Sequence, residues 1–291
     1  MSEHDHSASI ERAAVLGAGT MGHGIAHVLA ASGIETRLYD VADDAVEAGR
    51  ARVAANLEKG VARGKVTEEA RDAALANLSG TTDLDAAIDG VQFVVEAVPE
   101  RMDLKTSIFG KLGDALDASV VLATNTSSLS ITKIGEATAH PERVVGMHFF
   151  NPVHIMKLVE VVRTDATSDA AAETALGLAR RMGKEPIDVR DFPGFASSRL
   201  GIAIGMEAIR MVEEGVASAE DIDKAMTLGY GFPMGPLRLT DLVGLDVRLS
   251  IAEYLSGELG ERFTPPGLLR EMVERGDLGK KSGRGFYDWS E

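Results

Sequence analysis

The amino-acid sequence predicts an α/β fold, in which a mostly parallel sheet occupies the first two thirds of the chain and an all-helical part follows. Up to about residue 190, short valine- and leucine-rich runs alternate with alanine-rich, charged helical stretches, the pattern of parallel strands joined by crossover helices. The segment "DFPGF" at 191–195 ends this alternation, and only helical patterns follow it. We therefore expect a flexible segment at residues 1–9, a sheet domain at 10–190 and a helical domain at 191–291.

The expected strands and helices can be placed in order along the chain. Six apolar runs predict strands, near residues 13–19, 35–40, 91–98, 119–125, 143–150 and 157–162. Long helices should follow the first two strands, with further helical material at residues 71–80 and 102–116. In the helical part, Ser218 with Asp221 is typical of a capping box that begins a helix, and Gly229 is typical of a helix stop.

The composition excludes several classes of function. A formal net charge of −15 argues against a nucleic-acid groove or an anionic membrane surface, since both need a basic footprint. The chain starts with a polar, acidic stretch unlike a signal peptide, and no run reaches the ~18 apolar residues of a membrane span, so a cytoplasmic location is expected. The sequence contains no cysteine, which excludes disulfides, cysteine-ligated zinc and thiol nucleophiles, and no metal site is expected.

The stretch "VLGAGTMGHGIA" carries Gly17, Gly19 and Gly22 directly after a strand-like run and directly before a helical one. In a Rossmann-type dinucleotide-binding fold the first glycine makes the turn, the second lets the backbone approach the pyrophosphate, and the third permits close packing of helix on strand. The amino terminus of the helix then holds the phosphate charge. We expect a dinucleotide here, with Thr20 and Met21 of the same loop also at the cofactor.

Asp40 closes the second expected strand, "ETRLYD", about 20 residues beyond the glycines, where this fold places an acidic residue. Its carboxylate can accept hydrogen bonds from an adenosine ribose but would repel a 2′-phosphate, by about 1–4 kcal/mol at ~4 Å. The residues that follow, 41–44, offer no cation that would bind such a phosphate. The sequence therefore predicts NAD rather than NADP as the cofactor.

Polar residues follow several of the expected strands, at the sheet edge where open α/β folds bind ligands. Glu96 and Glu100 follow the third strand, and His148 lies at the end of the fifth. The fourth strand is followed by Asn125, Thr126, Ser127 and Ser128. We expect the active site at this edge. A helix cap or turn is the alternative interpretation of Ser127 and Ser128.

Glu160 lies inside the apolar run "KLVEVV", where a carboxylate is costly to bury without a partner. Only about six residues, "NPVHIM", separate this run from the preceding one, too few for the crossover helix that a parallel pair requires. The two runs should therefore be antiparallel, and a connection centred on His154 places Glu160 opposite His148. Such a carboxylate would fix the imidazole tautomer and stabilise its protonated form, as a general base requires. The alternative is a structural pair that closes the sheet edge.

With these residues in place, the chain resembles the L-3-hydroxyacyl-CoA dehydrogenase family, close to its short-chain 3-hydroxybutyryl-CoA type. The resemblance runs in order from about residue 10 to the end, through "GAGTMGHGIA", "NTSSLSIT", "HFFNPVHIMKLVEVV", "DFPGF", "EDIDKAM", "GFPMGPLRLTDLVGLD" and "GKKSGRGFYDW". It implies NAD-dependent oxidation of the 3-hydroxyl of an acyl-CoA, a helical domain that serves the substrate, and a homodimer formed through that domain.

The resemblance also implies roles for individual residues. His148 is then the catalytic base, Glu160 its partner and Ser127 a ligand of the substrate oxygen. Glu100 and Lys105 lie where the family contacts the nicotinamide half of NAD. The remaining expected contacts are Asn125 to the cofactor and Asn151 to the substrate.

One position departs from the family pattern. The family commonly has asparagine in the motif after "PGF" as a fourth active-site residue, but "PGFASSRL" has Ser198 there, which puts the role of this position in doubt. Coenzyme A is polyanionic, and the segment after the second strand offers Lys59, Arg63 and Lys65 for its phosphates. A solvated helix end is the alternative interpretation of these three cations.

Two other functions stay open on the sequence alone. A related NAD-linked dehydrogenase could act on a free hydroxy acid or sugar acid, as the similar gulonate dehydrogenases do, and would need no site for CoA phosphates. A non-catalytic NAD-binding protein would not need the pair of His148 and Glu160, yet both residues are intact.

Overall fold

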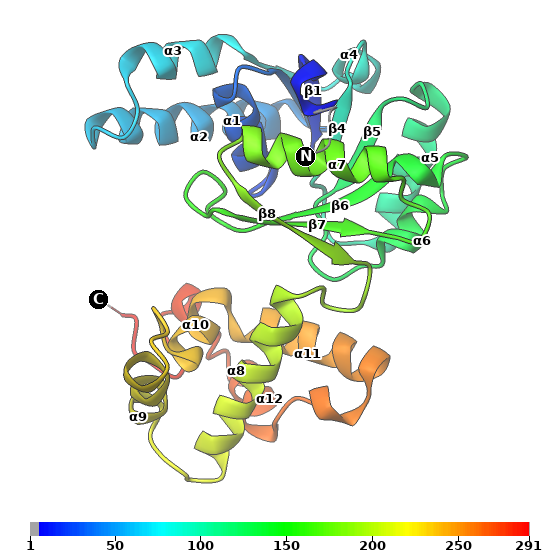
Figure 1. The fold of residues 1–291 in the computed structure, drawn as a ribbon. Coiled ribbons are helices and arrows are strands. Elements are labelled where there is room, and N and C mark those ends of the chain that lie inside the picture. Colours follow the sequence, from blue (N-terminus) through cyan, green and yellow to red (C-terminus); the bar gives the residue numbers. More distant parts are fainter. Residues whose placement is uncertain (1–5, 291) are drawn as a thin grey trace. The chain divides into compact units, whose positions relative to one another are not determined.

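The computed structural model describes residues 6–290, and in them the first part of the chain is built on one sheet of eight strands (Figure 1). The strands are β1 (Arg12–Leu16), β2 (Glu35–Tyr39), β3 (Leu78–Thr81), β4 (Phe93–Glu96), β5 (Val121–Thr124), β6 (Val144–Phe149), β7 (Leu158–Arg163) and β8 (Glu185–Arg190). Neighbouring strands are parallel except for the antiparallel pair of β6 and β7. The predicted α/β fold with a mostly parallel sheet is confirmed.

The order of the strands across the sheet is β3-β2-β1-β4-β5-β6-β7-β8. From β1 the chain moves outward to β2 and β3, then returns to β4 on the other side of β1 and continues outward through β5. Ligands of open α/β sheets bind at such a reversal, beyond the carboxyl ends of the strands. The register pairs Leu16 of β1 with Glu96 of β4, so the loops after these two residues border the expected ligand site.

Helices pack on the faces of the sheet. They are α1 (Gly22–Ala31), α2 (Asp43–Ala62), α3 (Glu68–Ala76), α4 (Leu84–Ile88), α5 (Met102–Ala115), α6 (Ile131–Gly135) and α7 (Asp169–Arg181). Alternate strand residues such as Val15 and Val95 share one buried cluster with Leu29 of α1 and Leu178 of α7. Because side chains alternate between the faces along a strand, α1 and α7 pack on the same face of the sheet.

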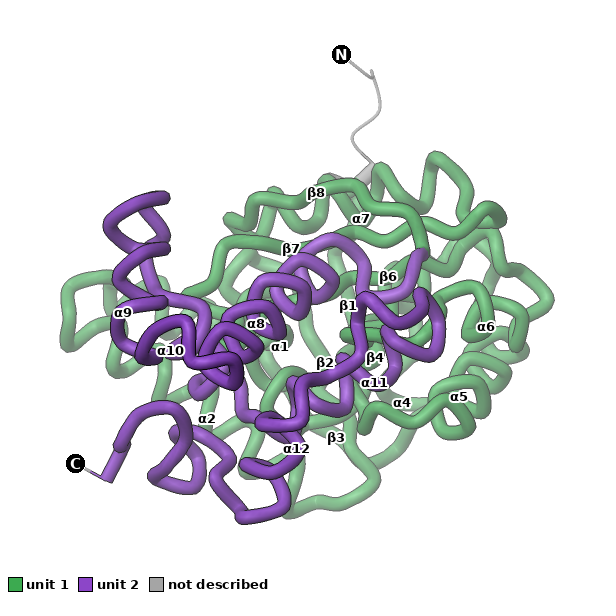
Figure 2. The backbone as a smooth tube through the Cα atoms, turned by 90° about the horizontal axis from the view of Figure 1, so that it is seen from below, with its two compact units in different colours: residues 1–191 green, residues 192–291 purple. Residues whose placement is uncertain are grey.

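The chain divides into two compact units, residues 1–191 and 192–291, and the second is helical (Figure 2). Its helices are α8 (Ser197–Glu213), α9 (Ala219–Lys224), α10 (Pro236–Val243), α11 (Leu245–Leu259) and α12 (Gly267–Glu274). They enclose a hydrophobic cluster of their own, which includes Ile209 and Leu255. Ser218 accepts a hydrogen bond from the amide of Asp221 and begins α9, as its capping box predicts. A π-helical turn, Ala225–Gly229, continues α9 and ends at the predicted stop.

The two strands at the edges of the sheet differ from the sequence prediction. Residues 71–80 are expected to be helical, but α3 ends at Ala76 and residues 78–80 belong to β3, so that expectation is wrong for these three residues. β8 has no counterpart among the predicted strands. Both strands have neighbours on one side only and expose or half-expose most of their residues. A strand in this position does not need the apolar run by which the buried strands are recognised.

The start of the described chain is tied to the first unit. Of the expected flexible segment, residues 1–5 lie outside the described residues, and His6–Ser9 form a short 3₁₀ helix. The guanidinium of Arg181 donates to the carbonyl oxygens of Ser7 and Ile10, at 3.2 and 2.7 Å. Among all the described residues, no helix is both long enough and apolar enough to cross a membrane.

Candidate active site

The three glycines of the first loop lie in different surroundings. Gly17 has a φ of +101°, and a Cβ there would lie 2.7 Å from the carbonyl oxygen of Ala97. A Cβ on Gly22 would lie 1.6 Å from the carbonyl oxygen of Gly17, so only glycine lets α1 begin this close to the turn. Among the described residues, apart from its chain neighbours, nothing lies within 4 Å of a Cβ built on Gly19. This open backbone at the start of α1 fits a dinucleotide pyrophosphate.

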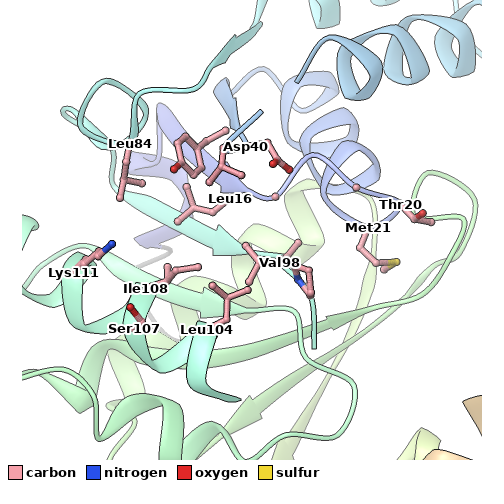
Figure 3. Close-up of a pocket in the computed structure, with 16 residues that line it drawn as sticks. Leu16, Thr20, Met21, Asp40, Leu84, Val98, Leu104, Ser107, Ile108 and Lys111 are labelled. Carbon is pink, nitrogen blue, oxygen red and sulfur yellow. The ribbon is translucent and has the colours of Figure 1, made fainter. Parts of the chain in front are cut away.

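A cavity of about 650 Å³ opens beside this loop (Figure 3). Asp40 lies in its wall, where one carboxylate oxygen accepts a hydrogen bond from the amide of Ala18 at 2.8 Å. This bond fixes the carboxylate against the glycine loop, and the second oxygen can accept from a ribose hydroxyl. Thr20 and Met21 line the same cavity. The structure therefore brings together Asp40 and four loop residues that the sequence analysis assigns to the cofactor.

Helix α5 supplies a further wall of the cavity that the sequence analysis did not identify. Leu104, Ser107, Ile108 and Lys111 line it, together with Leu84 (Figure 3). The four α5 residues follow the spacing i, i+3, i+4 and i+7, which places them on one helical face. A mainly apolar wall with few polar groups suits a flat aromatic ring such as adenine. The helical spacing was the signal that could have pointed to these residues.

We expect Asp40→Ser and Asp40→Arg to narrow the preference for NAD over NADP, because the carboxylate that repels a 2′-phosphate is removed. The ratio of kcat/KM for the two cofactors should fall by about fivefold or more, the equivalent of a repulsion of about 1 kcal/mol or more. Lys111→Met is the matched control, since Lys111 lines the same cavity and its loss should not raise the use of NADP. An unchanged ratio in both Asp40 variants would mean that this carboxylate does not face the ribose.

His148 and Glu160 form a buried pair on the antiparallel strands β6 and β7. The register places them directly opposite each other, and Nδ1 of His148 lies 2.7 Å from a carboxylate oxygen of Glu160. The predicted opposition is confirmed. The two residues are 6% and 0% exposed, and the ring of Phe150 packs against the imidazole with centroids 4.6 Å apart. An ionised carboxylate can only accept, so an ionised Glu160 would place the proton on Nδ1 and leave Nε2 as the basic nitrogen.

Glu100 holds the turn that follows β5. One of its carboxylate oxygens accepts from the hydroxyl of Thr126 at 2.5 Å and from the amides of Ser127 and Ser128 at 2.9 and 3.3 Å. The hydroxyl oxygen of Thr126 in turn accepts from the amide of Leu129 at 3.0 Å. Glu100 and Ser127, which the sequence analysis places at the same sheet edge, are thus in direct contact. Thr126 and Glu100, rather than a serine side chain, cap this turn.

Two of the remaining expected cofactor contacts lie in the interior of the first unit. Asn125 is 8% exposed, and its amide oxygen accepts from the backbone amide of Phe149 at 3.0 Å, next to His148. Lys105 is fully buried, and its ammonium donates to Glu96 at 2.7 Å. The described contacts of Lys105 are therefore with protein groups. Neither residue lines the cavity beside Asp40.

Four of the expected substrate contacts lie on the surface of the first unit. Lys59 is in the last turn of α2, Arg63 is its carboxyl-terminal cap and Lys65 follows, all three exposed. This placement agrees with a phosphate contact and equally with a solvated helix end. Asn151 is exposed in the connection after β6. Ser198 is half-buried in the first turn of α8 and belongs to the second unit.

Comparison with known proteins relates nearly the whole chain to one family. Residues 12–192 match the family model of the 3-hydroxyacyl-CoA dehydrogenase NAD binding domain, and residues 194–289 match that of its C-terminal domain. A 3-hydroxybutyryl-CoA dehydrogenase of Mycobacterium tuberculosis is 48% identical over 286 residues, which cover 97% of this chain and 100% of the relative. A probable 3-hydroxybutyryl-CoA dehydrogenase of Bacillus subtilis is 47% identical, covering 97% of this chain and 98% of the relative. The crystal structure of (S)-3-hydroxybutyryl-CoA dehydrogenase from Ralstonia eutropha matches with a TM-score of 0.94 at 41% identity, covering 97% of this chain and 100% of that one.

Proposed function

The chain belongs to the 3-hydroxyacyl-CoA dehydrogenase family, and from this premise we infer that it reversibly oxidises the 3-hydroxyl of an L-3-hydroxyacyl-CoA to a 3-keto group. It is an NAD-dependent oxidoreductase. The observation that carries the mechanism is the buried pair of His148 and Glu160, 2.7 Å apart. A short acyl chain is part of the proposal, because the relatives described above are 3-hydroxybutyryl-CoA dehydrogenases.

We assign proton transfer to Nε2 of His148. The carboxylate of Glu160 holds the proton of Nδ1, so Nε2 takes the proton of the 3-hydroxyl, and Glu160 stabilises the imidazolium that forms. Burial of both side chains keeps water from competing for the proton. Ser127 is proposed to donate its hydroxyl hydrogen to the substrate oxygen as this becomes a carbonyl. In the reverse direction the imidazolium returns the proton to that oxygen.

The residues present fit NAD. Gly17, Gly19 and Gly22 shape the loop at the start of α1, and Asp40 lies beside it in the cavity wall. When bound, NAD accepts the hydride that leaves C3 of the substrate. The residues that we propose to hold it are Gly17, Gly19, Thr20, Met21, Gly22, Asp40, Glu100 and Asn125. The family resemblance also implies a contact of Lys105 with the nicotinamide half, and Lys105 lies buried between Glu96 and Glu100.

The proposed substrate is tested by NADH oxidation with acetoacetyl-CoA, against free acetoacetate and against 3-ketoacyl-CoA thioesters of four to sixteen carbons. We expect the four-carbon thioester to give the highest kcat/KM and free acetoacetate to give little activity. Comparable activity on the free acid would favour a dehydrogenase of free hydroxy acids or sugar acids. A triple variant in which Lys59, Arg63 and Lys65 are each replaced by methionine should have a higher KM for acetoacetyl-CoA, because we propose that these cations hold its phosphates.

The domain roles, the assembly and the location complete the proposal. We propose that residues 10–190 bind NAD and that residues 191–291 serve the substrate and form a homodimer, as the family resemblance implies. The expected solution mass is then twice the 30.8 kDa of the chain, measured by light scattering on the full-length protein. A cytoplasmic location is proposed as well.

We expect Ser198→Ala to lower kcat/KM by less than Ser127→Ala does. A serine offers one hydroxyl on a short arm where the family commonly has an asparagine with a carbonyl acceptor and two amide hydrogens. A bridging water, enthalpically nearly as good as a direct contact, could fill the difference in length, and Ser197 could share the role. Ser198→Asn should remain active, because the site should tolerate the residue that the family uses. Both variants are measured with acetoacetyl-CoA. A decrease of kcat/KM in Ser198→Ala equal to or larger than that in Ser127→Ala would instead make Ser198 a catalytic residue.

A further inference from the structure

A fully buried carboxylate lies at the carboxyl end of β4, next to the turn that carries Ser127. Glu96 is 0% exposed, and three donors surround its oxygens. One oxygen accepts from the amide of Val98 and from the ammonium of Lys105, both at 2.7 Å. The other accepts from the hydroxyl of Thr124 at 2.6 Å. Glu96 thus joins the end of β4 to the end of β5 and to the first turns of α5.

Lys105 lies between two carboxylates. Its ammonium donates to Glu96 at 2.7 Å and, more weakly, to the carbonyl oxygen of Val98 at 3.4 Å. The same ammonium lies 3.6 Å from the second carboxylate oxygen of Glu100. The side chain of Lys105 is 0% exposed, whereas that of Glu100 is 39% exposed. Without the cation, two carboxylates would repel each other across this site, and the exposed one is free to turn toward water.

Glu100 is also the acceptor for the amides of Ser127 and Ser128. A chain of contacts therefore runs from the buried Glu96 through Lys105 and Glu100 to the backbone of Ser127. We propose that Lys105 is a positioning residue: its ammonium keeps Glu100 on these amides and so holds Ser127 in place for the substrate oxygen. The proposal rests on the function assigned above, in which Ser127 contacts that oxygen.

The first experiment measures amide hydrogen exchange in the full-length protein without cofactor or substrate. We expect Lys105→Met to raise the exchange rate of the Ser127 and Ser128 amides at least tenfold, because Glu100 no longer holds them. The amide of Ala70, which Thr67 caps in α3, should exchange as in wild type. Unchanged protection of the Ser127 and Ser128 amides would overturn the proposal, and this readout does not depend on catalysis.

The second experiment is a double-mutant cycle on kcat with acetoacetyl-CoA. Lys105→Met should lower kcat by about 10- to 100-fold, the cost of misplacing a group by about 1 Å, with KM changed less. In a Glu100→Gln background the same substitution should lower kcat by less than about threefold, because the effect passes through Glu100. Fully additive losses would show that Lys105 acts on cofactor or substrate by another route, and would contradict the proposal. An inactive wild type would instead reject the proposed function, and the exchange experiment would still decide the role of Lys105.

Two further variants separate positioning from loss of a buried charge. Arg143 is 3% exposed, and its guanidinium donates to the carbonyl oxygens of Gly113 and Leu116 at the far end of α5. Arg143→Met should destabilise the fold without raising exchange at Ser127. The double variant Glu96→Gln/Lys105→Met removes both charges of the buried ion pair. It takes the place of Lys105→Met in both experiments if Lys105→Met alone does not fold. Recovery of wild-type kcat and exchange in this double variant would show that Lys105 serves only to neutralise Glu96.

Discussion

Replacing His148 with glutamine is expected to lower turnover by about 10²- to 10⁴-fold, the range for removal of a general acid–base group. Glutamine can hydrogen bond, but it cannot take up the proton of the 3-hydroxyl near neutral pH. NADH binding should stay within a few-fold of wild type, because the cavity that fits the cofactor is lined by the glycine loop, Asp40 and α5 rather than by His148. The expected loss is therefore in kcat.

The measurement combines NADH oxidation with acetoacetyl-CoA, a fluorescence titration with NADH and a circular-dichroism spectrum. Glu160→Gln should also lower turnover, since the imidazolium then loses the carboxylate 2.7 Å away. Phe150→Leu is a control for packing, because it removes the ring against the imidazole and leaves the hydrogen bond in place. Near-native kcat in a folded His148→Gln or Glu160→Gln variant would reject the catalytic pair in favour of a structural one.

The pairing of His148 with Glu160 could be predicted because it follows from chain connectivity. Six residues cannot hold a crossover helix, so β6 and β7 had to be antiparallel, and in an antiparallel pair the register follows from the centre of the connection. The glycine loop and Asp40 were predictable for a similar reason, since each is fixed by its distance along the chain from a recognisable strand. Signals of this kind depend on local spacing alone.

Contacts between segments far apart in the sequence could not be predicted in the same way. The sequence places Glu96 at the edge of the expected active site, and the family resemblance places Lys105 at the cofactor, but nothing in the sequence indicates that both are fully buried. Their partner Thr124 ends β5, and Glu100 lies in the loop between β4 and α5, so only the folded sheet brings Thr124 to Glu96. The edge strands β3 and β8 were missed because half-exposed strands lack an apolar run.

A second histidine pair lies in the first unit. His27 of α1 stacks on His154 of the β6–β7 connection, with ring centroids 5.2 Å apart and planes inclined by 15°. His27 is 7% exposed, and among the described residues its buried Nδ1 has no hydrogen-bond partner. Burial, followed by the nearby His154, His23 and Lys184, lowers the pKa of His27 to about 4. Burial also lowers the pKa of His154.

This pair predicts a specific loss of stability in acid. An unfolded histidine has a pKa of about 6.5, so between that pH and about 4 unfolding takes up a proton at His27. The stability that His27 confers is fully present above pH 6.5 and falls as the pH drops toward 4, with a loss of about 2 kcal/mol at pH 5. Carboxylates also titrate in this range, but they do so equally in wild type and in a His27 variant.

We therefore expect wild type to lose about 2 kcal/mol more of its unfolding free energy than His27→Gln does between pH 7.5 and 5.0. Urea unfolding followed by circular dichroism at both pH values gives the two differences. Glutamine carries no proton equilibrium, so whatever stability it costs is the same at both pH values and cancels. Equal losses in wild type and His27→Gln would mean that the folded protein binds the proton at His27 as readily as the unfolded chain does, which a stacked, buried imidazole without a partner for Nδ1 should not allow.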